Sequence, residues 1–142
     1  MALLQRSFEI EARDFVRAGE ASIEVQRILK TIGFDSERIR RASICAYESE
    51  MNVVMHGGDG EILLTLDPEK IILDVKDHGP GIEDVELALQ EGYSTASLED
   101  REMGFGAGMG LPNIKKNADS LEIHSDKVTG VHLKIVINVK EG

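Results

Sequence analysis

The alternation of apolar and polar residues near the start of the chain predicts a β-strand, and a helical pattern follows it. Residues 7–12 alternate strictly, with Phe8 and Ile10 on one side, as in a half-buried strand. From residue 14 to residue 32 apolar side chains recur every three or four positions, and Gly33 then provides a stop signal. We therefore expect a strand over 7–12 and a helix over 14–32.

The next patterns predict a long helix and a β-hairpin. The helix is expected to begin at Asp35 or Ser36, either of which can cap its first turn, and to end at Gly57. Two apolar, β-branched runs follow, over 61–66 and 71–77, and the residues between them have turn chemistry. Antiparallel strands joined by a short turn form a hairpin, so we expect these two runs to pair.

The C-terminal half of the chain predicts two further helices, one long loop and two strands. A short helix is allowed over 83–90, and the glycine-rich residues 92–110 have no sustained period, which is typical of a mobile loop. A helix is expected over 112–118, a short strand over 121–124 and a clear strand over 131–139. Because the strands have one apolar side and the helices are their available cover, we expect an α/β fold, a two-layer sandwich with a mixed, mostly antiparallel sheet and helices on one face.

Composition and charge narrow the class of protein. The 142 residues suit a single domain, residues 1–142, with its own hydrophobic core. The formal net charge of −10 argues against nucleic acid or an anionic membrane as the partner, because both attract basic surfaces. No apolar run approaches the length of a membrane span. Cys45, the sole cysteine, is expected to be a buried apolar residue, so we expect a cytoplasmic protein without an internal disulfide.

Three polar or glycine-rich stretches mark the candidate site. Glu48 and Asn52 are four residues apart, so they lie on one face of the long helix, one turn apart. Asp77 ends an inward-facing row of its strand, where a carboxylate needs a hydrogen-bond donor, and a glycine turn follows it. Residues 104–110 are rich in glycine and lead into a helix start, whose free N–H groups favour an anion. The spacing does not match a P-loop or a dinucleotide fingerprint, yet together the stretches indicate one nucleotide site.

In this order, the three stretches resemble the motifs of the ATPases grouped as gyrase, histidine kinase and MutL relatives. Residues 48–57 resemble the first motif of that group, residues 77–81 the second, and residues 104–110 the glycine-rich end of its lid. Within the group, the chain is most similar to the stand-alone bacterial serine kinases that act as anti-sigma factors or stressosome switch kinases. The resemblance implies the Bergerat-type ATP-binding fold, with a glycine-rich lid over residues 92–110.

The resemblance also implies ATP and Mg²⁺ as cofactors and a role for each motif residue. Glu48 would be the catalytic base, Asn52 would hold Mg²⁺ against the phosphates, and Asp77 would accept a hydrogen bond from the adenine amino group. Lys115 could approach the phosphates, although a surface lysine more often has no specific partner. The implied cofactor-binding residues are Asn52, Asp77, Gly79, Gly81, Thr95, Gly104, Gly106, Gly108, Gly110 and Lys115.

Two functions remain open at this stage. The first is an ATP-dependent serine/threonine protein kinase that transfers phosphate from Mg-ATP to a small regulatory protein of the anti-sigma-antagonist type. The second is a non-catalytic, ATP-dependent binding module that sequesters a sigma factor or another client. Glu48 favours the kinase, because binding alone requires no base. A histidine kinase would need a phosphoacceptor histidine before the ATP domain, and we expect none because the first strand starts within the first ten residues. The sequence also leaves open whether the protein forms a homodimer.

Overall fold

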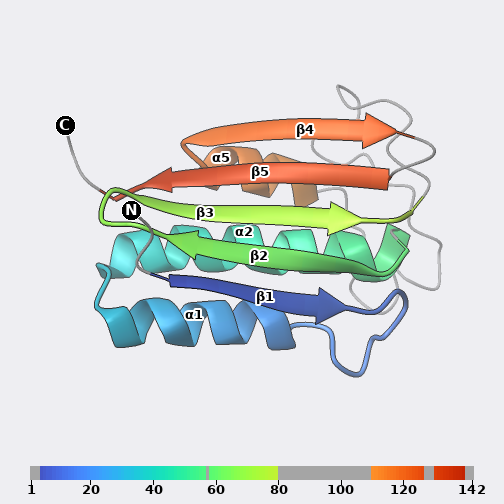
Figure 1. Cartoon of the computed structure of the whole chain (residues 1–142), viewed down its shortest axis with the longest axis horizontal. Coiled ribbons are helices and arrows are strands. Elements are labelled where there is room, and N and C mark those ends of the chain that lie inside the picture. The colour runs from blue at the N-terminus through green and yellow to red at the C-terminus, as the bar shows by residue number, and fades with distance from the viewer. Residues whose placement is uncertain (1–3, 57, 80–109, 127–129, 140–142) are drawn as a thin grey trace.

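The computed structural model describes residues 4–56, 58–79, 110–126 and 130–139. These residues form a five-stranded sheet and three helices, arranged as two layers (Figure 1). Within them, no helix is long and apolar enough to cross a membrane. In chain order the elements are β1 (Leu4–Ile10), α1 (Glu20–Ile32), α2 (Ser36–His56), β2 (Gly60–Leu66), β3 (Lys70–Asp77), α5 (Gly110–Asn117), β4 (Ser120–Asp126) and β5 (Gly130–Asn138).

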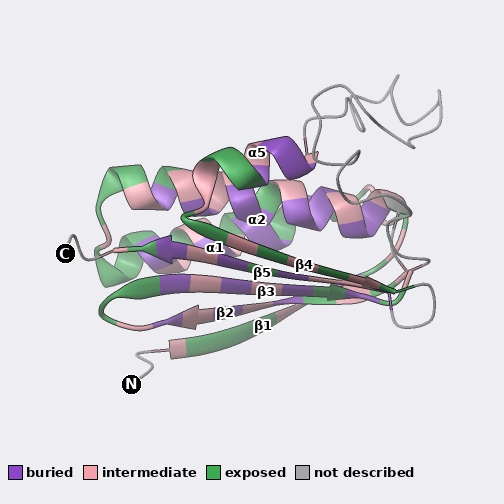
Figure 2. Cartoon of the chain, turned by 90° about the horizontal axis from the view of Figure 1, so that it is seen from above, coloured by how far each residue is buried: buried purple, intermediate pink, exposed green. Residues whose placement is uncertain are grey.

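The sheet has the strand order β1-β2-β3-β5-β4, and each pair of neighbours is antiparallel. The predicted hairpin is confirmed: β2 pairs with β3, with Ile62 opposite Val75. In Figure 2 the three helices lie on one side of the sheet, and the other side has no helical cover among the described residues. The predicted two-layer α/β class is therefore confirmed, and the described part of the sheet is antiparallel throughout.

The hydrophobic core lies between the helices and the covered face of the sheet. Alternate residues of the three central strands point into it, as the period-two patterns predict. Each helix contributes one apolar stripe. Fully buried core side chains include Ile62, Leu64, Leu66, Ile71, Leu73, Ile135 and Ile137 from the sheet and Val25, Leu29, Ala42, Cys45, Ala46 and Ile114 from the helices.

The first strand begins earlier than predicted. It runs over Leu4–Ile10, because the pairing with β2 extends back to Leu4 opposite Leu66. The sequence pattern did not predict this start, because Arg6 interrupts the apolar side of the strand. The Arg6 guanidinium lies 5.7 Å from the centre of the Phe8 ring. The fourth strand is also longer than the predicted 121–124 and spans Ser120–Asp126.

The first helix begins at Glu20, so the prediction of helix over residues 14–19 is wrong. Gly19 has a left-handed φ of 101°, which ends the preceding turn. The buried carboxylate of Glu50, on α2, then accepts hydrogen bonds from the first N–H groups of α1: Oε2 from Gly19 (3.0 Å) and Ala21 (3.2 Å), and Oε1 from Ser22 (3.0 Å). A side chain from another helix thus caps α1 and sets its start.

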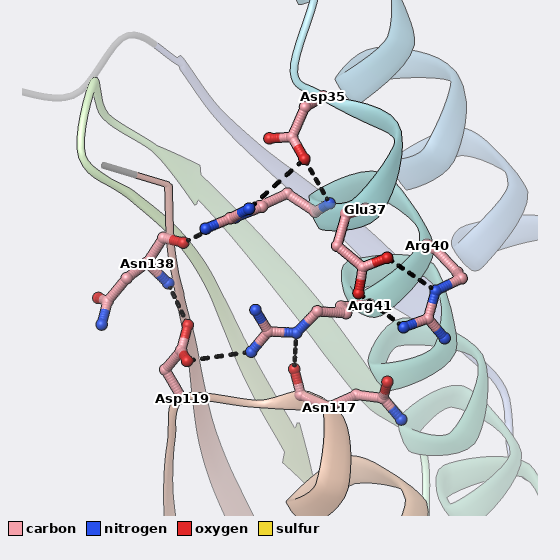
Figure 3. A network of polar contacts seen from close by, with 8 residues as sticks. Asp35, Glu37, Arg40, Arg41, Asn117, Asp119 and Asn138 are labelled. Atoms are coloured by element: carbon pink, nitrogen blue, oxygen red, sulfur yellow. Dashed lines mark hydrogen bonds and ion pairs between the residues drawn. The ribbon is translucent and has the colours of Figure 1, made fainter. Parts of the chain in front are cut away.

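The start of α2 is held by a polar network that joins it to the opposite end of the chain (Figure 3). The Arg41 guanidinium donates to the Asn117 carbonyl (2.7 Å) and pairs with Asp119 at 3.1 Å. Asp119 also accepts the Asn138 N–H at 2.7 Å, and Arg38 donates to the Asn138 carbonyl at 3.3 Å. Partial burial raises the pKa of Asp119, but the Asn138 N–H and the Arg41 guanidinium together outweigh it and lower that pKa.

Candidate functional site

The candidate site is built on the contact between α2 and α5, which we call the α2–α5 seam. The seam residues of α2 are three or four positions apart, so they lie on one face of the helix. Their partners on α5 follow in reverse order, which shows that the two helices are antiparallel. The paired positions are Arg41 with Asn117, Cys45 with Ile114, Glu48 with Asn113, and Asn52 with Gly110.

The middle of the seam is apolar and tightly packed. Ile114 and Cys45 are fully buried, and the Cys45 thiol lies 3.7 Å from the Ile114 carbonyl oxygen, within the range of a weak S–H donor. Burial raises the pKa of Cys45 to about 12, so the group stays a protonated thiol and is not a reactive nucleophile. This contact fixes α5 against α2 beside the predicted site residues.

Glu48, the predicted catalytic base, meets one side chain across the seam. The Asn113 amide donates to Glu48 Oε2 at 2.6 Å. Since a carboxylate can only accept, the amide nitrogen must face it, and the bond has the short length of a charge-assisted hydrogen bond. A groove of about 390 Å³ opens beside this pair and gives Glu48 access to solvent. It is lined by Ser43, Ile44, Tyr47, Glu48, Asn113 and Asn117.

Asn52 lies one turn further along α2, against the first residue of α5. A Cβ on Gly110 would lie 3.0 Å from Asn52 Oδ1, so the absence of a side chain at residue 110 lets the two helices approach this closely. The amide of Asn52 therefore sits at a helix N-terminus, where unpaired N–H groups favour an anion. The structure thus brings together two residues that the sequence assigns to the nucleotide, one from α2 and one from the start of α5.

Asp77 is buried at the end of β3, and its hydrogen-bond donors are backbone groups. Its Oδ1 accepts N–H bonds from Gly79 (2.9 Å) and from Val131 on β5 (3.3 Å). A Cβ on Gly130 would collide with the Asp77 carbonyl oxygen, and Gly130 also has a positive φ of 90°, so glycine is required there. The expectation that this carboxylate finds a donor is met, and the donor comes from the protein itself.

The glycines after α2 bring the helix and the Asp77 turn to the same end of the molecule. A Cβ on Gly60 would lie 3.0 Å from the Val53 side chain and 3.1 Å from the Asp77 Cα atom. Gly58 packs in the same way against the His78 carbonyl group. The last turn of α2, the end of β3 and the start of α5 therefore share one end of the sandwich, on the right in Figure 1.

Of the remaining predicted residues, Lys115 is the one that the structure describes. Its side chain is exposed on α5, and within the described ranges it forms no hydrogen bond or ion pair with the other predicted residues. Among the residues that can be described, no group of three or more His, Cys, Asp or Glu side chains could hold a metal ion by itself. The predicted helix 83–90 and residues 92–109 of the predicted loop lie outside the described residues, as do Gly81, Thr95, Gly104, Gly106 and Gly108, whereas Gly110 begins α5.

Two residues close to the predicted pair on α2 and α5 were not predicted from the sequence. Asn113 bonds Glu48, and its signal was its position three residues after Gly110 on the helix that faces α2. Glu50 caps α1. The signal in the sequence was its charge at a position, two residues after Glu48, that lies on the buried side of an amphipathic helix. These signals mark the two residues, but the partner of each is fixed by how the helices pack against one another.

Comparison with known proteins identifies the family. The chain belongs to the family described as the histidine kinase-like ATPase domain, which matches residues 10–137. It is 24% identical over 115 residues to the serine/threonine-protein kinase RsbT of Bacillus subtilis, covering 78% of this chain and 80% of that protein. It is 30% identical over 126 residues to an anti-sigma F factor of Caldanaerobacter subterraneus, covering 87% and 80%.

Two further comparisons agree with the predicted family and fold. An anti-sigma F factor of Thermoanaerobacter sp. is 31% identical over 104 residues, which cover 70% of this chain and 69% of that protein. The mycobacterial sensor histidine kinase MprB has a similar structure, with a TM-score of 0.55 and 15% identity over 98% of this chain and 100% of the compared chain. That likeness shows the fold alone. The predicted resemblance to the gyrase, histidine kinase and MutL group is thus confirmed.

Proposed function

We propose that this protein is an ATP-dependent serine/threonine protein kinase. Its substrate would be the hydroxyl group of a small regulatory protein of the anti-sigma-antagonist type, and residues 1–142 would act as a single, cytoplasmic domain. Membership of an ATPase-domain family and the names of the similar proteins, a serine/threonine kinase and anti-sigma factors, support this proposal. The observation that carries it is the placement of Glu48, a carboxylate at a groove, one turn from Asn52 on a helix face held by α5.

Glu48 fits the role of the catalytic base. Phosphoryl transfer needs the attacking oxygen and the γ-phosphorus to be held in line, with a group to take the hydroxyl proton. In the proposed step the hydroxyl oxygen forms a bond to the γ-phosphorus, the bond to the β–γ bridging oxygen breaks, and ADP leaves. The hydroxyl proton passes to Glu48. A carboxylate that reaches solvent through the groove can meet a hydroxyl of another protein.

Asn52 and Gly110 fit the phosphate end of the nucleotide. Mg²⁺ prefers oxygen ligands and is usually bound by one or two protein groups together with phosphates and water, so a single amide oxygen suits it, and the N–H groups at the start of α5 would favour the phosphates. When bound, the ion would neutralise charge on the phosphates. Asn52 would hold it through Oδ1, which a side chain at residue 110 would obstruct, since a Cβ there would lie 3.0 Å away. Because Oδ1 of Asp77 already accepts two N–H groups, we assign the proposed adenine contact to its other oxygen.

The second candidate function is the non-catalytic binding module, in which ATP sets the affinity for a sigma factor or another client. The names of the anti-sigma F factors among the similar proteins support it. In that case the carboxylate of Glu48 would have no chemical role. The two functions therefore differ in what a substitution at Glu48 does.

The test is a phosphotransfer assay with Mg-[γ-³²P]ATP and a panel of purified anti-sigma-antagonist domains and sigma factors from the same genome. Glu48→Gln keeps the size of the side chain and removes the base. We expect Mg-ATP affinity to survive and the transfer rate to fall by roughly 10²- to 10⁴-fold. Glu122→Gln, an exposed glutamate on β4, is the matched control and should transfer at the wild-type rate. Wild-type protein that binds a sigma factor in the presence of ATP and labels no partner would favour the binding module.

A further inference from the structure

We propose that Asn113 is a positioning residue for the phosphotransfer reaction, which acts by orienting the carboxylate of Glu48. The inference rests on the proposed kinase function, since it concerns the group assigned as the base. Asn113 lies outside the three motifs on which the nucleotide site was predicted. Its link to the site is the 2.6 Å hydrogen bond from its amide to Glu48 Oε2.

This bond distinguishes the two oxygens of the carboxylate. Oε2 is engaged by the amide, and within the described part of the chain no donor bonds Oε1. A base needs one oxygen available for the incoming hydroxyl and a fixed direction for its lone pairs. The Asn113 amide meets both needs, because it takes up one oxygen, stops rotation of the carboxylate and leaves the other oxygen for the proton.

The amide can fix Glu48 because α5 itself is fixed. Ile114, the next residue, is fully buried against Cys45, and the Arg41 guanidinium holds the Asn117 carbonyl at the end of the helix. The Asn117 side chain in turn donates to the Asn113 carbonyl at 2.8 Å. Donor and acceptor therefore sit on two packed helices, and side chains on such elements are held more precisely than side chains on loops.

Loss of the amide should reduce turnover and leave binding intact. Without its donor, the Glu48 side chain would populate several rotamers, and only some would direct an oxygen at the hydroxyl. Within the described part of the site, the Asn113 side chain bonds Glu48 and forms no hydrogen bond with Asn52 or Asp77, so Mg-ATP affinity should not change. This pattern, a lower kcat at constant KM for ATP, is the one expected for an interaction that matters in the transition state.

The experiment measures kcat and KM for ATP with Mg-[γ-³²P]ATP and the panel protein that accepts label from the wild type. We expect Asn113→Ala to lower kcat by roughly 10- to 100-fold, the range set by a hydrogen bond to a charged group, with KM within about twofold of wild type. Asn113→Gln retains an amide donor and should recover part of the rate. Asn138→Ala is the matched control: it removes the amide of an exposed asparagine on β5 that does not line the groove and is bonded through its backbone, and it should transfer at close to the wild-type rate.

A double-mutant cycle separates positioning from a general structural effect. If Asn113 acts through Glu48, then Asn113→Ala should have no further effect on the rate of the Glu48→Gln protein. Equal losses in both backgrounds, or an Asn113→Ala protein with wild-type kcat, would overturn the inference while leaving the kinase function in place. A wild type that labels no panel protein would overturn the kinase proposal and, with it, the role of Asn113.

Discussion

The two ends of the α2–α5 seam use similar side chains in opposite ways. At the Arg41 end, a guanidinium, a carboxylate and backbone carbonyl and N–H groups pair with one another across α2, the turn after α5 and the end of β5 (Figure 3). At the Glu48 end, a carboxylate meets a single amide beside a groove, and Asn52 faces a glycine. We call the Arg41 end closed, because its polar groups bond one another. At the other end, within the described residues, Oε1 of Glu48 accepts no hydrogen bond.

The difference shows how one pair of helices can serve both stability and chemistry. Polar groups that satisfy each other lower the free energy of the folded state, because none is left without a partner when it leaves water. Polar groups that face an open groove contribute less to folding, and they can bind a ligand that supplies the missing partners. If this division holds, substitutions at one end should change stability, and substitutions at the other should change binding or turnover.

The largest effect beyond those already described is expected at Asn52. Asn52→Ala removes the proposed oxygen ligand, and the affinity for Mg-ATP should fall by about 1.5 to 3 kcal/mol, the range for hydrogen bonds to charged groups. The free energy of unfolding without nucleotide should stay within about 0.5 kcal/mol of wild type, because within the described residues the Asn52 side chain forms no hydrogen bond that the substitution would break. Isothermal titration calorimetry and urea denaturation measure the two quantities. Unchanged Mg-ATP affinity would contradict the role of Asn52.

At Arg41 we expect a smaller effect, on the stability of the fold and not on the affinity for Mg-ATP. Arg41→Met keeps the aliphatic stem but removes the bonds to Asn117 and Asp119, so the free energy of unfolding should fall by about 1 to 2 kcal/mol. Arg40→Met is the matched control, because Arg40 pairs with Glu37 in an exposed ion pair on the same helix, and such pairs contribute about 0 to 1 kcal/mol. Urea denaturation compares the two. Equal losses of unfolding free energy in the two variants would contradict the division between the two ends. So would a weaker affinity for Mg-ATP in Arg41→Met alone.

The periodic elements and the shared face of Glu48 and Asn52 were predictable from the sequence because each depends on nearby residues. The burial of Ile71, Leu73 and Val75 follows from their period of two, and the shared face of Glu48 and Asn52 follows from helix geometry. The fold class followed from the need of each strand to cover one apolar side.

The features that were not predicted depend on contacts between distant segments. The start of α1 is set by Glu50, a residue of the next helix, and the donors to Asp77 include Val131 from the last strand. The partner of Glu48 is Asn113, which lies 65 residues later in the sequence, on another helix. No local pattern specifies these pairings, because the three-dimensional arrangement of the elements has to be known first.

The smallest expected effect is a pH dependence at the closed end of the seam. The pKa of Asp119 is lowered in the folded protein, so its ionised form contributes stability that is fully present above the unfolded-state pKa of about 3.9 and is lost as the pH falls through the folded-state value. Asp119→Asn should therefore reduce the free energy of unfolding at pH 7, by roughly 0.5 kcal/mol because the carboxylate is partly exposed and screened. The difference from wild type should shrink below about pH 4. Raising the salt concentration at pH 7 should also reduce it, because salt weakens the Asp119–Arg41 attraction. Thermal unfolding of both proteins between pH 7 and pH 3 measures this difference, and a constant value across that range would show that the Asp119 charge does not stabilise the closed end.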